Sequence, residues 1–190
     1  MRESFVNTLI DIEDDIWTIS NTMRDGIYRF FKNKTSLKIA ELGAYKGYTT
    51  RFLAQLFNYV YAVDINDGFL EENKEFNNKF SNIDYIKCDL YNSGWENIPR
   101  DVNVVFIDAY HEYENCRSDL DKSLEYFNNL KYIIFDDYGV FPGVKKVVDD
   151  AIEAGVLKFE CWIGLTNVPT VGGKYVKGVS EGVICSKVIK

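Results

Sequence analysis

The chain has 190 residues, of which 46% are hydrophobic and 27% are charged, as expected for a globular protein that can bury a full core. Its 22 basic and 29 acidic residues give a net charge of −7, which argues against a nucleic-acid partner because phosphate binding needs clustered Lys and Arg. The sequence shows no signal peptide and no apolar stretch of membrane-spanning length, so we expect a cytoplasmic protein with no membrane partner.

Apolar residues recur every three or four positions over residues 3–24 and predict an amphipathic helix, which Gly26 separates from a second short helix ending at Phe31. Strands and helices then alternate along the chain, as is typical of an α/β protein with a mostly parallel sheet. The predicted strands are 37–41, 59–64, 84–87, 102–107, 132–135, 157–163 and 182–189, and the predicted helices are 48–56, 69–80, 113–128 and 143–154. The last two strands are expected to pair as a hairpin across the loop 164–181.

A glycine-rich turn, E-L-G-A-Y-K-G from Glu41 to Gly47, follows the first of these strands. Glycine tolerates positive φ and lets a ligand lie against the backbone, and the helix that follows offers free N–H groups. The second strand ends on Asp64, where a carboxylate can accept hydrogen bonds from two ribose hydroxyls. Strand, glycine turn, helix, strand and terminal acid together predict a nucleotide-binding βαβ unit.

The spacing of the turn argues against a dinucleotide. Tyr45 stands where a dinucleotide turn has its middle glycine, and the carboxylate of Glu41 would repel a pyrophosphate. The pattern E-x-G-x-x-x-G with an acid at the second strand end resembles motif I of class I S-adenosylmethionine-dependent methyltransferases. The resemblance implies a Rossmann-like sheet of seven strands in the order 3-2-1-4-5-7-6, with strand seven antiparallel and helices on both faces. We expect a single domain, with residues 1–35 as an N-terminal helical cap and residues 36–190 as the Rossmann-like core.

Acidic residues stand at or just after the ends of five predicted strands, and in such sheets the carboxyl ends form the ligand-binding edge. The resemblance implies that the cofactor is bound by Glu41, Gly43, Tyr45, Gly47, Thr49, Asp64, Ile65, Asp89, Leu90 and Asp108. Among these, Asp89 resembles the acid that contacts the adenine amino group, with Leu90 or Tyr91 bordering the ring.

Asp108, Asp136 and Asp137 follow the fourth and fifth strands, which are expected to be neighbours. Three like charges share a small space only with proton uptake or a cation, and hard carboxylate oxygens favour Mg²⁺ or Mn²⁺ over zinc. The phrases I-D-A-Y-H-E-Y-E from Ile107, D-D-Y from Asp136 and P-G-V after it resemble divalent-cation-dependent O-methyltransferases. Macrolide-sugar O-methyltransferases and cephalosporin-hydroxylase-like proteins look closer than catechol O-methyltransferase, whose second ligand after strand five is usually Asn. This resemblance covers about residues 36–163, and solvated loop carboxylates are the alternative interpretation.

His111 is the only histidine of the chain and follows Asp108 by three residues. An imidazole with a pKa near ~6.5 can take the proton of an acceptor hydroxyl, so we predict His111 and Asp108 as the catalytic pair, although a lone histidine in a polar loop can be a surface residue. The predicted function is a metal-dependent O-methyltransferase that acts on a small-molecule hydroxyl, foremost a sugar hydroxyl of a glycan or glycoside. A catechol or phenol acceptor and a cofactor-binding domain without methyl transfer are the alternatives, and a homodimer is one option for assembly.

Overall fold

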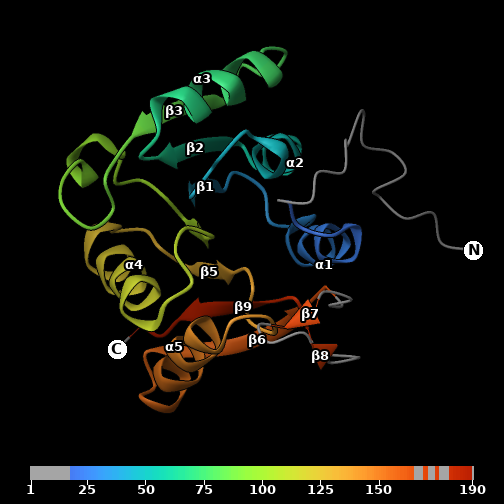
Figure 1. Ribbon diagram of the computed structural model, residues 1–190, viewed down its shortest axis with the longest axis vertical. Coiled ribbons are helices and arrows are strands. Elements are labelled where there is room, and N and C mark those ends of the chain that lie inside the picture. Colours follow the sequence, from blue (N-terminus) through green and yellow to red (C-terminus); the bar gives the residue numbers. More distant parts are fainter. Residues whose placement is uncertain (1–17, 165–168, 171–173, 176–179, 190) are drawn as a thin grey trace, which may run out of the picture.

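The computed structural model describes residues 18–164, 169–170, 174–175 and 180–189, and one seven-stranded sheet runs through it (Figure 1). The strands are β1 (Lys38–Leu42), β2 (Tyr59–Asp64), β3 (Ile83–Lys87), β4 (Val104–Ile107), β5 (Tyr132–Phe135), β6 (Leu157–Ile163) and β9 (Gly182–Lys187), with β7 (Pro169–Thr170) and β8 (Lys174–Tyr175) as a separate pair. The helices are α1 (Asn21–Phe31), α2 (Tyr48–Leu56), α3 (Asp67–Phe76), α4 (Tyr113–Tyr126) and α5 (Pro142–Glu153), with a 3₁₀ turn at Trp95–Asn97.

The strand order is β3-β2-β1-β4-β5-β9-β6. Strands β1 to β5 pair in parallel, whereas β9 is antiparallel to both β5 and β6. The predicted order is therefore confirmed, with β9 as the seventh strand. The chain leaves β1 toward β2 and β3 and returns to the other side of β1 with β4, so the carboxyl ends of β1 and β4 form the topological switch point at which such sheets bind ligands.

The register of the central strands aligns their carboxyl ends. Leu42 of β1 pairs with Val63 of β2 and with Ile107 of β4, and Ile107 in turn pairs with Phe135 of β5. Each of these residues is followed at once by a residue of the glycine turn or by an acid. The tertiary structure therefore brings the acids after β2, β4 and β5 to one edge.

Both faces of the sheet are covered, which explains why its central strands are apolar throughout. One buried cluster joins α1 and α2 to residues such as Ile39 and Phe106, and the other joins α4 and α5 to residues such as Leu42 and Ile107. Figure 1 shows these two pairs of helices on opposite sides of the sheet. Full burial of side chains of this size stabilises the fold by ~1.5–3 kcal/mol each.

The predicted helix break at Gly26 is wrong. Helix α1 starts after Ser20, whose Oγ accepts a hydrogen bond from the Met23 N–H at 3.1 Å, and it runs through Gly26 to Phe31. A Cβ at Gly26 would lie 2.8 Å from Cγ2 of Ile163, so glycine lets α1 pack closely on β6. The predicted helical residues 3–17 lie outside the described part of the chain. Among the described residues, no helix is both long enough and apolar enough to cross a membrane.

Candidate functional site

The glycine turn after β1 is packed directly against the end of β4. Gly43 has a φ of +94°, and a Cβ there would lie 2.2 Å from the carbonyl oxygen of Asp108. The N–H groups of Gly43 and Ala44 both donate to the carbonyl oxygen of Val63, at 2.9 and 3.0 Å. The turn is thus fixed between β2 and β4, and only glycine fits at its first position.

A series of buried, hydrogen-bonded polar side chains also packs against the turn. A Cβ at Gly47, whose φ is +91°, would lie 2.3 Å from Oδ1 of Asn73. Asn73 donates to Oγ1 of Thr50 at 3.0 Å, and this hydroxyl donates to Glu41 Oε2 at 2.5 Å. Glu41 is 1% exposed, and its burial raises its pKa well above the usual range although the Thr50 hydrogen bond opposes this. Glu41 therefore stabilises the turn from within the core.

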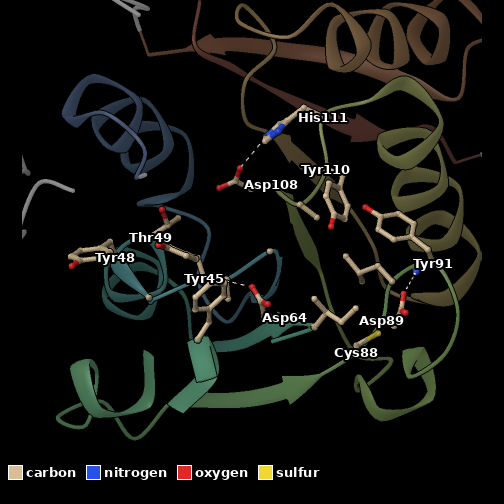
Figure 2. Close-up of a pocket in the computed structure, with 17 residues that line it drawn as sticks. Tyr45, Tyr48, Thr49, Asp64, Cys88, Asp89, Tyr91, Asp108, Tyr110 and His111 are labelled. Atoms are coloured by element: carbon tan, nitrogen blue, oxygen red, sulfur yellow. Dashed lines mark hydrogen bonds and ion pairs between the residues drawn. The ribbon is translucent and has the colours of Figure 1, made fainter. Parts of the chain in front are cut away.

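A pocket of about 550 Å³ opens above the turn (Figure 2), a size suited to a small cofactor. The predicted residues that line it are Gly43, Tyr45, Gly47, Thr49, Asp64, Ile65, Asp89, Leu90, Asp108 and His111. Glu41, Asp136 and Asp137 are not part of its wall. Sequence reasoning gave no role to five further lining residues, Ala44, Tyr48, Phe69, Cys88 and Ala109. Of these, Phe69 packs its ring against Tyr45 with centres 4.5 Å apart, a contact that no sequence pattern signals.

Asp64 and Asp89 are held in place by backbone N–H groups. Asp64 Oδ2 accepts from the Tyr45 N–H and Oδ1 from the Asn66 N–H, both at 2.9 Å. Asp89 accepts from the Asn92 side chain at 2.7 Å and from the Tyr91 N–H at 3.0 Å. These hydrogen bonds lower the pKa of Asp89, the Asn92 side chain contributing most, and Figure 2 shows both carboxylates on the pocket wall. Asp89 is therefore ionised at neutral pH with a fixed orientation.

Next to this pocket, Asp108, His111 and Asp137 form a cluster whose potential ligand atoms all lie within 4.8 Å of one another. His111 Nε2 lies 2.8 Å from Asp137 Oδ2 and 3.6 Å from Asp108 Oδ1. Among the described residues Nε2 has no hydrogen-bond partner of regular geometry, so these contacts are ion pairs. Asp137 has a φ of +58°, a left-handed conformation that side-chain-bearing residues rarely adopt and that occurs often at functional sites.

This cluster differs from the predicted set of three aspartates, because His111 belongs to it and Asp136 does not. Asp136 is buried, and its Oδ1 accepts a hydrogen bond from the Asp137 N–H at 2.8 Å. A further acid, Glu181, faces the cluster and accepts from the Ser20 N–H at 2.8 Å. Sequence reasoning missed Glu181 because it lies in a loop without apolar periodicity.

The acids of this region outnumber its positive charges, which among the described residues include His111 and, near Glu181, Arg24. Burial raises the pKa of Asp108 to about 6, although His111 opposes this, and burial together with the charge of Asp108 raises that of Asp136 well above its usual range. Burial also raises the pKa of Glu181, against the effect of its hydrogen bonds from Ser20. An added cation would lower all three pKa values.

His111 is held in its protonated form in this structure. Burial lowers its pKa, but the ion pairs with Asp108 and Asp137 outweigh burial and raise it to about 10. Its ring stacks on that of Phe141, with centres 4.3 Å apart and an angle of 14° between the planes. A Cβ at Gly143 would lie 2.4 Å from the His111 carbonyl oxygen, so the start of α5 supports this loop closely. Acting as a base requires His111 first to lose the proton that the two aspartates stabilise.

Residues 40–138 match the family model described as a methyltransferase domain. The chain belongs to this family. The match covers β1 to the residues after β5, and so includes the glycine turn, the pocket and the Asp108–His111–Asp137 cluster. A curated relative, an uncharacterised protein of Acanthamoeba polyphaga mimivirus, is 27% identical in an alignment of length 141 that covers 64% of this chain. The chain spans 63% of the length of that relative.

Solved methyltransferase structures share the fold. An S-adenosylmethionine-dependent O-methyltransferase of Thermotoga maritima superposes with a TM-score of 0.68 at 16% identity, over 91% of this chain and 67% of its own. A precorrin-6y C5,15-methyltransferase of Geobacter metallireducens gives 0.65 at 14% identity, over 92% and 93%. The magnesium protoporphyrin IX methyltransferase of Synechocystis, with S-adenosylhomocysteine bound, gives 0.62 at 14% identity, over 87% and 81%. Their names give different acceptors, so the shared fold leaves the acceptor of this protein open.

Proposed function

We propose that this protein uses S-adenosylmethionine to methylate a hydroxyl oxygen of a small molecule, with the help of a divalent cation. Asp108 carries the proposal, because it lines the pocket above the glycine turn and also belongs to the Asp108–His111–Asp137 cluster. A methyl donor in the pocket would therefore lie beside the groups that handle the acceptor. The S-adenosylhomocysteine bound in the Synechocystis structure supports the choice of cofactor.

The pocket offers a separate contact for each part of the cofactor. Each oxygen of Asp64 accepts one backbone N–H and keeps a lone pair for a ribose hydroxyl. Asp89 can accept from the adenine amino group at the other end of the pocket. Gly43 and Ala44 line the pocket at the turn, where the methionine end with its ammonium and carboxylate would lie. These roles follow the resemblance and agree with the places of the residues on the pocket wall.

The residues of the cluster suit a divalent cation. Four carboxylates (Asp108, Asp136, Asp137 and Glu181) face two positive groups, the imidazolium of His111 and the guanidinium of Arg24 near Glu181, a balance of −4 + 2 = −2 when all are ionised. Asp108 and Asp137 would bind the cation with His111 as a neighbour, and their carboxylate oxygens suit Mg²⁺ or Mn²⁺. When bound, the cation would supply the positive charge that lowers the pKa of the acceptor hydroxyl.

In the proposed reaction His111, in its neutral form, accepts the proton of the acceptor hydroxyl as the oxygen attacks the methyl carbon. His111 can be neutral only when Asp108 and Asp137 have a positive partner other than the imidazolium. The ability of His111 to act as a base is therefore linked to binding of the cation in the cluster. The leaving group is a neutral sulfide and needs no acid. The remaining contribution of the chain is to align the two reactants and exclude water.

We propose a sugar hydroxyl of a glycan or glycoside as the first acceptor to test. A catechol or phenol is the second candidate. The net charge of −7 disfavours a nucleic acid. A homodimer stays a prediction that sedimentation of the purified protein can check.

The test measures binding before turnover. Calorimetry with S-adenosylhomocysteine should show one site, and methyl transfer from labelled S-adenosylmethionine is then followed on panels of glycosides and catechols with Mg²⁺, Mn²⁺ or EDTA. We expect EDTA to remove activity and Asp137→Asn to lower kcat/KM by roughly 100-fold or more. Asp121→Asn, at an exposed acid of α4 that pairs with Arg117, is the control and should change neither.

Each outcome bears on a different part of the proposal. Full activity in EDTA would contradict the role of the cation but leave the methyltransferase in place. Binding without turnover on either panel would favour a cofactor-binding domain without methyl transfer. Absence of S-adenosylhomocysteine binding would contradict the proposal as a whole.

A further inference from the structure

Helix α4 holds the loop after β3 through two side chains that lie one helical turn apart. Lys122 Nζ donates a hydrogen bond to the carbonyl oxygen of Leu90, which also accepts one from Trp95 Nε1 at 2.9 Å. The hydroxyl of Tyr91 donates to Asp119 Oδ2 at 3.2 Å. The position of this loop therefore depends on α4 as well as on the sheet.

The loop that α4 holds is one wall of the pocket. Leu90 and Tyr91 line it, as does Tyr110, whose ring centre lies 5.6 Å from that of Tyr91. Figure 2 shows these two rings beside each other at the end of the pocket where Asp89 stands. Flat aromatic side chains pack well against a flat aromatic ligand, so this end suits a nucleobase.

The carboxyl group of Asp119 is unfavourable where it lies. Asp119 is fully buried on the same face of α4 as Cys116, Leu120 and Ser123. Its Oδ1 has no hydrogen-bond partner among the described residues. Burial raises its pKa to about 7, although the hydrogen bond from Tyr91 opposes this. Apolar groups in place of both Asp119 and the Tyr91 hydroxyl would suit the site better, because a buried polar atom without a partner destabilises a fold.

We propose that Asp119 is a positioning residue of the cofactor pocket, which fixes the Tyr91 ring through its hydroxyl as the wall against which the adenine base packs. Asp119 itself lies behind the wall and acts only through Tyr91. A ring that is already fixed loses less conformational freedom when the base binds, and this preorganisation increases affinity. The inference rests on the proposed function, since adenine is the base of S-adenosylmethionine.

The experiment compares Asp119→Leu with Asp119→Asn, using S-adenosylhomocysteine as the probe in calorimetry and the melting temperature as the measure of stability. Leucine removes the acceptor of the Tyr91 hydroxyl, so we expect Kd to rise about threefold to tenfold, the effect of one lost hydrogen bond. The double variant Asp119→Leu/Tyr91→Phe replaces both partners of the hydrogen bond and should melt at a higher temperature, because it removes a buried carboxyl with an unpaired oxygen and leaves no donor without an acceptor. Asparagine keeps an oxygen acceptor and should restore Kd to that of the unmodified protein.

Two further variants separate positioning from general damage. Tyr91→Phe should weaken binding as much as Asp119→Leu does, and the double variant should weaken it no further, because both changes break one hydrogen bond. Tyr61→Phe is the matched control: the Tyr61 hydroxyl donates to Asp101 at 3.1 Å, and neither residue lines the pocket. Its affinity for S-adenosylhomocysteine should stay unchanged.

Three results would overturn the proposal: unchanged affinity in Asp119→Leu, equal losses of affinity in Asp119→Leu and Asp119→Asn, or a lower melting temperature together with weaker binding in the double variant. The last result is what a purely structural role predicts. If the unmodified protein itself does not bind S-adenosylhomocysteine, the proposed function fails and this inference fails with it. That case is distinct from one in which the unmodified protein binds and the variants bind equally well.

Discussion

Replacing Gly43 by Ala tests the close contact between the glycine turn and the end of β4. At a φ of +94° an L side chain is strained, which costs ~1–2 kcal/mol. The new Cβ would also lie 2.2 Å from the Asp108 carbonyl oxygen and 2.8 Å from the Ala109 Cα, and both of these are backbone atoms. The turn or the strand end would have to move by ~1 Å, and overpacking of this kind typically costs ~1–3 kcal/mol more. We therefore expect Gly43→Ala to lower the free energy of unfolding by ~2–5 kcal/mol.

Gly155 provides the matched control, because its φ is +65° and a Cβ there would meet nothing within 4 Å. Gly155→Ala carries the backbone strain without the collision and should cost only ~1–2 kcal/mol. Urea unfolding followed by circular dichroism measures both variants, provided that the m-values agree. Calorimetry should show S-adenosylhomocysteine binding weakened by roughly tenfold or more in Gly43→Ala and unchanged in Gly155→Ala, since tenfold needs only ~1.4 kcal/mol. Equal destabilisation of the two variants would refute the argument that the turn packs on β4.

The remaining predictions concern buried polar groups. Because burial raises the pKa of Asp119 to about 7, the unfolded chain loses this proton near pH ~4 before the folded protein does, and stability falls as the pH rises toward 7. The titratable neighbours of Asp119 are Tyr91, Lys122, Cys88 and Cys116. Asp119→Leu should remove this fall in stability, so its melting temperature relative to that of the unmodified protein should rise between pH 5 and pH 8. A difference that stays constant over this range would contradict the raised pKa of Asp119. Thr50→Val removes the donor to Glu41 and should cost ~1–3 kcal/mol in urea unfolding, whereas Glu41→Gln keeps an acceptor and should cost clearly less. Glu181→Gln removes one negative charge but no predicted metal ligand. Mn²⁺ binding, measured by electron paramagnetic resonance, should therefore weaken severalfold in Glu181→Gln and by far more in Asp137→Asn. An equal loss of Mn²⁺ binding in the two variants would make Glu181 a ligand.

Much of the fold follows from patterns within short stretches of the chain. The strand that ends at Asp64 and the helix from Tyr48 to Leu56 have the predicted bounds, because apolar runs and three-to-four-residue periodicity reflect local geometry. The break predicted at Gly26 was wrong for the opposite reason. Its glycine serves a contact with Ile163, which is distant in sequence, and no local pattern distinguishes a packing glycine from one that ends a helix.

The candidate site likewise has features that local patterns predict and features that depend on contacts between distant residues. The carboxyl ends of parallel strands share an edge, so the order of strands and acids was enough to predict that Asp64, Asp89 and Asp108 line one pocket. The finer arrangement around Asp108 depended on side-chain directions and on distant segments. Asp137 turns toward His111, Asp136 accepts the hydrogen bond of the next N–H, and Glu181 comes from the loop directly before β9.

Short-range order in the amino acids was sufficient for the alternation of elements, the glycine turn and the acids at the strand ends, since each depends on neighbours a few positions away. The three-dimensional packing alone decided how tightly the turn meets β4, which carboxylates face His111, and that Asp119 reaches a pocket residue from behind its wall. These features depend on atoms that come within hydrogen-bonding or van der Waals distance only when the chain is folded. Charge states follow the same rule, because burial and neighbouring charges shift pKa values and both exist only in the packed structure.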